Sequence, residues 1–142
     1  MASVALELYT VRDETARDFA GTVRRVAALG YPAVEFAGYG DLDAARMRDL
    51  LTETGMRAAA THVGLAALES DLDREITYCL TLGCSHLILP WLPPEQRSSA
   101  FFGTLTPRLN EFGRRCQAAG IRFGYHNHDF EFQLEDGVTL LE

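Results

Sequence analysis

Short apolar runs alternate along this chain with longer segments in which apolar residues recur every three or four positions. The short runs are typical of buried strands, and the longer segments are typical of amphipathic helices. We expect strands at 4–9, 33–36, 57–63, 86–89 and 121–128. We expect helices at 15–29, 43–54, 68–82 and from 98 or 99 to 119, and the first turn of another helix at 138–142.

Each of the four full helical segments is followed by a glycine and then by a strand. The glycines are typical helix stops: Gly30, Gly55, Gly83 and Gly120. Strands that alternate with helices predict a parallel sheet with helical crossovers, in one domain covering residues 1–142. The pattern fits either an open doubly wound sheet or a (βα)8 barrel. The sequence does not indicate a dinucleotide-binding fold, because no Gly-x-Gly-x-x-Gly turn follows the first strand.

The strands carry polar side chains on one face. In the fifth strand the bulky Phe123 and Tyr125 are expected to face the helices, which leaves Gly124, His126 and His128 on the inner face of a barrel. The same alternation in the other strands gives an inward set of Glu7, Glu35, His62, His126 and His128. Such groups are costly to bury unless they bind a metal, pair with each other or meet a substrate. Most lie near carboxyl ends of strands, where barrel active sites are built.

Each of these residues also has a structural interpretation. Glu7 and Glu35 are compatible with buried carboxylates that pair with an arginine. A lone His62 would be typical of a hydrogen-bonded core histidine, although a second histidine on the same face favours function. His86 begins its strand at the opposite end of the sheet, and we expect it to be structural.

Three residues in the loops leave two interpretations open. Asp129 and Glu131 follow the fifth strand and fit either a solvated loop or a contact with substrate. Trp91 follows the fourth strand, where its ring is expected to form a wall against a sugar face or a hydrophobic cap.

Composition and charge exclude several classes of partner. The chain has 142 residues, 47% of them hydrophobic, and a net charge of −7. This negative net charge argues against binding of nucleic acid and against docking on an anionic membrane, because a protein needs a basic face for either. We expect a cytoplasmic protein with reduced thiols, because the sequence shows no signal peptide or membrane span and its three cysteines lack metal-type spacing.

All 13 basic residues are arginines, and the chain contains no lysine. This excludes Schiff-base catalysis and a P-loop lysine within these residues. Carbon–carbon or isomerisation chemistry here would therefore use a metal, or carboxylate and imidazole groups that act as acids and bases.

Four motifs resemble one known family. They are ELYTVRDE in the first strand and its loop, GYPAVEFAGY at the second strand, THVG at the third and GYHNHDFEF at the fifth. Together they resemble the sugar phosphate isomerase/epimerase family of xylose isomerase-like TIM barrels, a group that also holds inosose dehydratase and endonuclease IV relatives. The resemblance covers the whole chain. It implies an α/β fold made of the first five strands of a TIM (β/α)8 barrel, which is incomplete as given.

The resemblance implies a metal-dependent enzyme acting on a sugar, a sugar phosphate or a cyclitol. Family members hold Mn²⁺, Mg²⁺, Co²⁺ or Zn²⁺ at the mouth and move a proton between adjacent carbons. His126 takes the place of a strand-five ligand, where many members have glutamate, so we expect it to bind the metal. We expect catalytic roles for Glu35, His62 and His128, and substrate contacts from Glu7, Trp91 and Glu131. Alternatives are a lyase acting on a keto-cyclitol and a non-catalytic half barrel.

The chain offers five of the eight strands that a barrel of this class needs, so the ligands expected from strands six to eight are absent. Three explanations stay open: a fragment of a complete enzyme, one subunit of a split protein completed by a C-terminal half, or a homo-oligomer. An open half barrel leaves strand edges unpaired, which favours association. We expect a small-molecule sugar or cyclitol substrate and neither nucleic acid nor membrane as partner.

Overall fold

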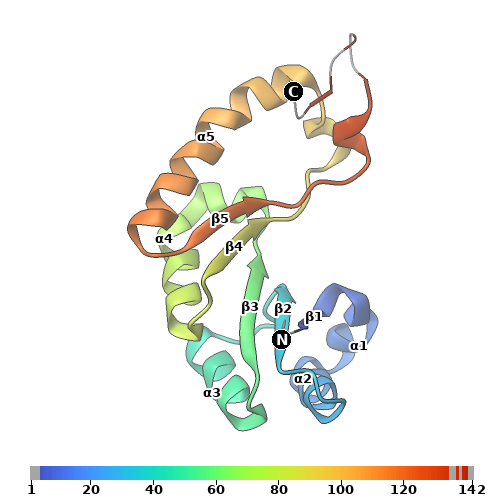
Figure 1. The fold of residues 1–142 in the computed structure, drawn as a ribbon, viewed down its shortest axis with the longest axis vertical. Coiled ribbons are helices and arrows are strands. Elements are labelled where there is room, and N and C mark those ends of the chain that lie inside the picture. The colour runs from blue at the N-terminus through green and yellow to red at the C-terminus, as the bar shows by residue number, and fades with distance from the viewer. Residues whose placement is uncertain (1–3, 135–136, 138, 141–142) are drawn as a thin grey trace.

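The chain folds into one curved, fully parallel sheet with helices packed along its outer side (Figure 1). The computed structural model describes residues 4–134, 137, 139 and 140. The strands follow the chain in the order β1-β2-β3-β4-β5, namely Leu6–Glu7, Ala33–Ala37, Arg57–His62, His86–Leu89 and Arg122–Tyr125. A doubly wound sheet would change direction partway along this order. The unbroken order is that of a barrel wall, which confirms the partial (βα)n barrel predicted from the sequence.

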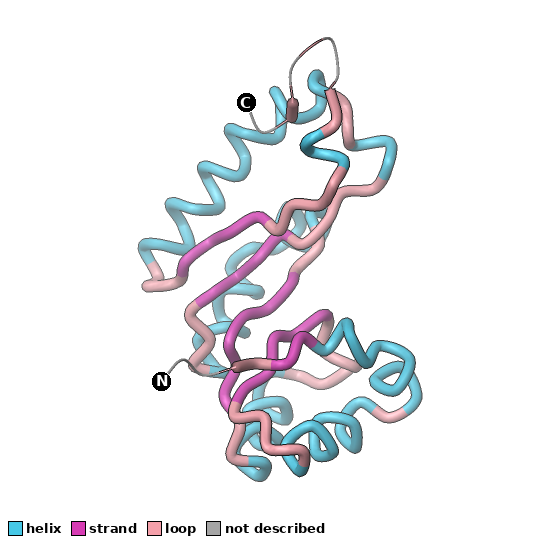
Figure 2. The backbone as a smooth tube through the Cα atoms, turned by 45° about the vertical axis from the view of Figure 1, so that its right-hand side comes forward, coloured by secondary structure: helices cyan, strands magenta, loops and turns pink. Residues whose placement is uncertain are grey.

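Five α-helices lie in the connections between these strands (Figure 2). They are α1 Arg12–Arg17, α2 Phe19–Ala28, α3 Ala44–Thr54, α4 Leu65–Leu82 and α5 Ser99–Ala118. Short 3₁₀ turns lie at η1 Leu8–Val11, η2 Pro94–Gln96 and η3 Phe130–Phe132. Side chains cap the starts of α3 and α5: the Asp43 side chain accepts a hydrogen bond from the Arg46 backbone N–H, and the Ser98 side chain accepts one from the Phe101 backbone N–H. Among the described residues, no helix is long and apolar enough to cross a membrane.

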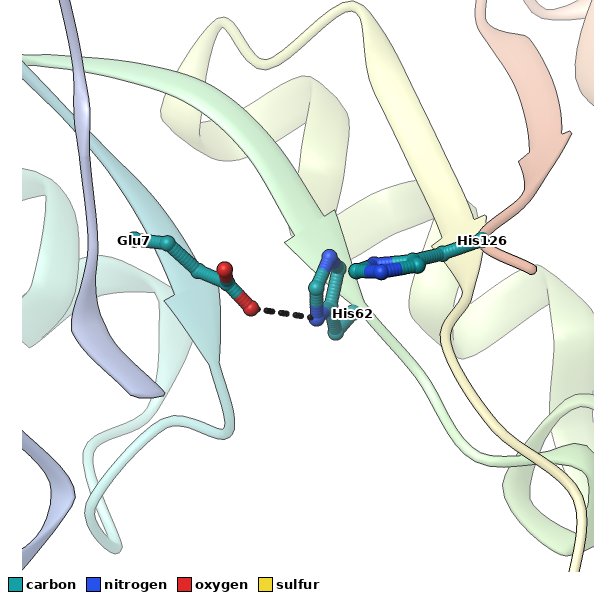
Figure 3. A group of neighbouring side chains, drawn as sticks. All are labelled: Glu7, His62 and His126. Atoms are coloured by element: carbon teal, nitrogen blue, oxygen red, sulfur yellow. Dashed lines mark ion pairs between the residues drawn. The ribbon is translucent and has the colours of Figure 1, made fainter. Parts of the chain in front are cut away.

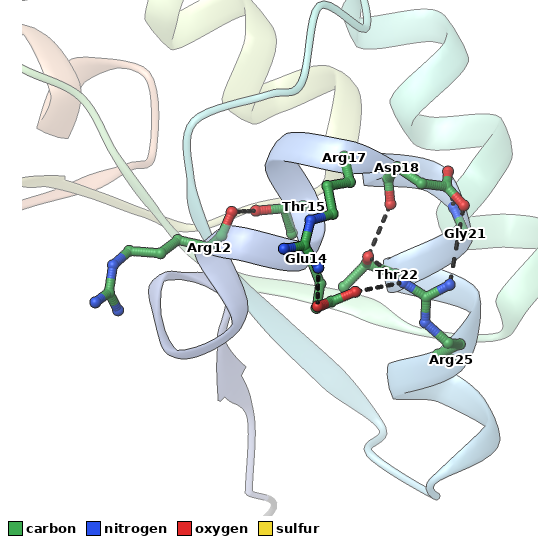
Figure 4. Close-up of polar contacts among 8 residues, drawn as sticks. All are labelled: Arg12, Glu14, Thr15, Arg17, Asp18, Gly21, Thr22 and Arg25. Atoms are coloured by element: carbon green, nitrogen blue, oxygen red, sulfur yellow. Dashed lines mark hydrogen bonds and ion pairs between the residues drawn. The ribbon is translucent and has the colours of Figure 1, made fainter.

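The first helical segment differs from the expectation of one helix over 15–29. The chain turns sharply at Asp18, where φ is −154°, so α1 and α2 are separate. The Asp18 side chain accepts a hydrogen bond from the Gly21 backbone N–H at 2.9 Å, and its carbonyl accepts one from the Thr22 hydroxyl (Figure 4). Glu14 pairs with Arg17 within α1 and with Arg25 of α2 across the break. Asp18 is therefore an N-cap inside an apparently continuous helical pattern.

Other boundaries also shifted. The first strand ends at Glu7 and the fifth at Tyr125, both before the residues expected from the sequence. Helix α4 begins at Leu65, ahead of the expected residue 68. The helical turn expected at 138–142 falls mostly outside the described residues.

The core lies between the sheet and the helices. Its fully buried members include Val34, Phe36, Leu87 and Leu89 from strands and Met47, Leu68 and Leu105 from helices. The alternation predicted for the fifth strand is confirmed: Phe123 packs edge-on against Phe112 of α5, and Tyr125 against Phe102 of the same helix. The three cysteines are buried with free thiols. The inner face of the sheet is therefore left for Glu7, Glu35 and their neighbours.

A β-bulge decides where the third strand points its side chains. Val34 pairs with Ala58, but the next residue, Glu35, pairs with Ala60, so Ala59 is an extra residue in β3. Such an insertion re-aims every side chain that follows it. Because Ala60 lies beside Glu35, His62 also falls on the inner face. Without the bulge, the alternation that starts at Ala58 would turn His62 toward the helices.

Gly40, in the loop between β2 and α3, is expected to tolerate no side chain. Its φ is +55°, and a Cβ there would lie 2.2 Å from the Phe19 ring. Gly40→Ala should lower the free energy of unfolding by about 1–3 kcal/mol, through strain and overpacking. Gly103→Ala is the matched control, because α5 has open space at this helical position and the change should be stabilising or neutral. Urea unfolding of both variants tests this, and equal effects would contradict it.

Candidate active site at the carboxyl edge of the sheet

His62, the last residue of β3, lies between two carboxylates from neighbouring strands. Its Nε2 is 2.6 Å from Oε1 of Glu35, and its Nδ1 is 3.5 Å from Oε1 of Glu7. The imidazole is 7% exposed, whereas the Glu7 and Glu35 side chains are 34% and 31% exposed. The histidine is thus held inside the protein, while both carboxylates reach the solvent on the inner face of the sheet.

The two carboxylates need a positive group beside them. Glu7 and Glu35 are direct partners in the β1–β2 register, and like charges in that arrangement repel. The contact of 2.6 Å assigns the Nε2–H of His62 as the donor to Glu35. The Nδ1 lone pair of a neutral ring then faces Glu7 at a distance longer than a good hydrogen bond. A cation near Nδ1 would satisfy the lone pair and Glu7 together.

His126 brings a third ligand atom to this place. It directly follows β5, and its backbone N–H donates to the Leu89 carbonyl at 3.0 Å, which continues the pairing of β5 with β4. Its ring lies edge-on to that of His62, with 5.6 Å between centroids. Ligand atoms of Glu7, His62 and His126 all lie within 4.8 Å of one another (Figure 3). One carboxylate and two imidazoles form a donor set suited to Zn²⁺, Co²⁺ or Mn²⁺.

His128 lies behind this group. Its ring stacks on that of His126, with centroids 4.9 Å apart, and on that of Phe130, with centroids 5.8 Å apart. Its Nδ1 is buried and has no hydrogen-bond partner among the described residues. His128 therefore contacts the His126 ring of the group formed by Glu7, His62 and His126. Its predicted catalytic role stays a prediction.

Two of the three loop residues that the sequence left open, Glu131 and Trp91, have definite contacts in the structure. Glu131 is 0% exposed, so a solvated position for it was wrong. One of its carboxylate oxygens accepts from the Tyr125 hydroxyl, and the other accepts from the His128 backbone N–H. Trp91 is 46% exposed, and the Arg97 guanidinium lies over its ring. Substrate contacts from Trp91 and Glu131 stay predictions.

Two residues, Arg97 and Tyr125, contact the loop after β5 and were not predicted from the sequence to do so. Arg97 lies 3.9 Å from the centre of the Phe130 ring and donates its Nε–H to the Leu92 carbonyl. Tyr125 was assigned to the helix side for its bulk, but its hydroxyl also holds Glu131. Burial, and then the hydrogen bond to the Glu131 carboxylate, raise the pKa of Tyr125. His86 begins β4 at the other end of the strands and contacts Ser85, as expected for a residue outside the site.

Comparison with known proteins identifies the fold. No family model matches the sequence, and no curated protein matches it. A solved sugar phosphate isomerase/epimerase from Parabacteroides distasonis ATCC 8503 has a TM-score of 0.80 and 21% identity, over 99% of this chain and 63% of that one. A second sugar phosphate isomerase/epimerase from the same organism has a TM-score of 0.75 and 19% identity, over 98% and 59%.

A solved AP endonuclease, family 2, from Brucella melitensis also matches, with a TM-score of 0.74 and 21% identity, over 88% of this chain and 55% of that one. At identities this low, the TM-scores show a shared fold, that of a TIM barrel. The chain spans about three fifths of the length of these structures.

Proposed function

We propose that this chain carries part of the active site of a sugar or sugar phosphate isomerase or epimerase, in which a divalent metal assists proton transfer between adjacent carbons. The observation that carries the proposal is the group of Glu7, Glu35, His62 and His126 at the carboxyl edge of the sheet. Active sites of TIM barrels lie at this edge. The structural neighbours named as sugar phosphate isomerases/epimerases support the same class of chemistry.

The residues present fit a metal. Glu7, His62 through Nδ1 and His126 would hold it, and Glu35 would fix the His62 ring by accepting its Nε2–H. A carboxylate on the far nitrogen of a ligating histidine is the usual support for such a ligand. A bound divalent ion would supply polarisation of a substrate carbonyl or hydroxyl. Two imidazoles favour Zn²⁺, Co²⁺ or Mn²⁺ over Mg²⁺.

The chain's own groups supply acid–base chemistry. The Glu35 carboxylate is partly exposed and in contact with the His62 imidazole, so it can take a proton from a substrate carbon while His62 donates a hydrogen bond to it. Glu7 is equally open to a bound sugar hydroxyl when it is not engaged by a cation. The exposed face of Trp91 offers an apolar surface to a sugar ring.

Further βα units would complete the site. Among the described residues, no strand pairs with the outer edge of β1 or of β5. A groove of about 630 Å³ runs along α5 and β5, lined by residues that include Leu109, Gly113 and Phe123. We propose that a strand parallel to β5 and its helix occupy this edge. These units come from a longer form of the protein, a separate polypeptide or a second copy of the chain.

Deuterium exchange tests the proposed function. The protein supplied with its completing βα units, loaded with Zn²⁺, Co²⁺ or Mn²⁺ in D₂O, should incorporate deuterium next to the carbonyl of one member of a panel of sugars and sugar phosphates. Glu35→Gln keeps an acceptor for His62 but loses the base, so exchange should fall by about 10²–10⁴-fold while metal content is unchanged. Nuclear magnetic resonance and elemental analysis give the two readouts.

The outcomes separate the alternatives. Loss of water with an enedione absorbance would assign a lyase acting on a keto-cyclitol. A stable homodimer in light scattering, without metal and without exchange, would indicate a non-catalytic half barrel. Absence of both metal and exchange from the completed protein would overturn the proposal.

A further inference from the structure

Glu131 is a charged side chain that the protein encloses completely. It lies in η3, just after the fifth strand, and is 0% exposed. The Tyr125 hydroxyl donates to its Oε1 at 2.5 Å, and the His128 backbone N–H donates to its Oε2 at 2.6 Å. A buried carboxylate is tolerated when hydrogen bonds satisfy both of its oxygens, and this one meets that condition within its own loop.

The two donors lie on either side of His126. Tyr125 is the last residue of β5, and His128 is two residues beyond His126. The carboxylate therefore closes the loop across the three residues 126–128 and fixes the direction in which the chain leaves the sheet. A loop conformation that breaks these hydrogen bonds while the carboxylate stays buried would leave the charge without partners. Few alternative conformations are therefore open to the loop.

The same loop carries three stacked rings, those of His126, His128 and Phe130, and the His126 ring belongs to the group with Glu7 and His62. The His126 ring stacks on His128, with an angle of 9° between planes, and His128 stacks on Phe130, with an angle of 11°. The Arg97 guanidinium also lies over the Phe130 ring, at 3.9 Å from the ring centre. Glu131 holds the backbone of this loop at His128, and the hydrogen bond from the His126 backbone N–H to the Leu89 carbonyl holds it on the strand side, so the His126 ring is fixed from both directions.

We propose that Glu131 is a positioning residue, whose buried carboxylate locks the loop after β5 so that the His126 ring stays beside His62 and Glu7. The substrate contact expected from the sequence is a separate prediction; the positioning role rests on the hydrogen bonds that both carboxylate oxygens accept from the protein. It rests on the proposed function in one respect, namely that His126 is a metal ligand.

The chain offers a matched control elsewhere. Glu75 of α4 is also buried, at 5% exposed, and it also accepts from a tyrosine, with the Tyr39 hydroxyl at 3.3 Å. This pair lies on the helix side of the sheet, where Thr61 donates to the same hydroxyl. Glu75→Gln therefore removes a buried charge next to a tyrosine without touching the loop after β5.

Two measurements on the full chain test the proposal: hydrogen exchange of the His128 amide and zinc affinity by calorimetry. In the wild type the His128 amide should be protected although it lies outside the strands and helices. Glu131→Gln should speed its exchange by at least about tenfold more than Glu75→Gln does. Zinc affinity should fall by about 10–100-fold in Glu131→Gln and stay within about twofold of wild type in Glu75→Gln.

Contrary outcomes are equally definite. An unprotected His128 amide in the wild type, or equal exchange and equal zinc affinity in the two variants, would overturn the proposal. If Glu131→Gln does not fold, Tyr125→Phe removes one of the two donors and should show smaller changes of the same kind, against Tyr39→Phe as control. If the wild type binds no zinc, the metal-dependent function fails, while the exchange of the His128 amide still decides the role of Glu131.

Discussion

Replacing His62 with alanine is expected to abolish divalent-metal binding by this chain. His62 is the one residue of the cluster that contacts both carboxylates and the ring of His126. Its loss removes a ligand atom and leaves Glu7 and Glu35 facing each other across the β1–β2 pair without a partner between them. Metal content after equilibration with zinc and dialysis should fall from about one ion per chain to none, since a site with two ligands from the protein is too weak to survive dialysis.

The control for this change is His86→Ala. His86 lies at the start of β4, at the opposite end of the strands, and its ring contacts Ser85. This variant should keep the zinc content of the wild type, which excludes a general effect of losing an imidazole. Full zinc content in His62→Ala would show that the metal, if any, is held elsewhere, and would remove the main support for the proposed function.

Replacing Phe36 with alanine is expected to lower the free energy of unfolding by about 3–5 kcal/mol, the range for truncating a buried phenylalanine. Phe36 is 0% exposed, lies in the middle of the hydrophobic core and packs against the Tyr39 ring at 6.3 Å between centroids. Helices α2, α3 and α4 close over this side of the sheet, so the cavity left by the ring cannot collapse easily. Chemical denaturation monitored by circular dichroism measures the change.

Phe132→Ala provides the comparison within the same residue type. Phe132 is 59% exposed, so its truncation should change the free energy of unfolding by no more than about 0.5 kcal/mol. The difference between the two variants isolates burial from side-chain chemistry. Equal losses would mean that the sheet does not pack against the helices as described.

The repeating units of the fold were predictable because their signals are local. Apolar spacing marked the helices, and glycine marked their ends; Gly55 and Gly83 indeed close α3 and α4 in left-handed conformations. Helix breaks were less predictable. Asp18 separates α1 from α2, and Asp71 has a non-helical φ of −157° inside α4; each aspartate caps the following turn with its side chain. Whether an aspartate inside a helical pattern faces solvent or caps a turn depends on packing that periodicity does not report.

The site was predictable where strand alternation is regular. Alternation placed Glu7, Glu35, His62 and His126 on the inner face, and the structure brings their side chains together. The position of His62 itself depends on the bulge at Ala59, which no sequence signal marked. Glu131 and Arg97 could not be placed beforehand, because a loop takes its conformation from contacts with distant segments, here with Tyr125, His128 and the ring of Phe130.

The sequential order of the sheet has a consequence for how the chain reaches this structure. Each strand pairs only with its neighbours in the sequence, so every pairing joins segments separated by one crossover connection. Closing one such connection costs less chain entropy than pairing strands that lie farther apart in the sequence. Each βα unit can therefore dock onto an edge already formed by the preceding units while the rest of the chain is still being synthesised.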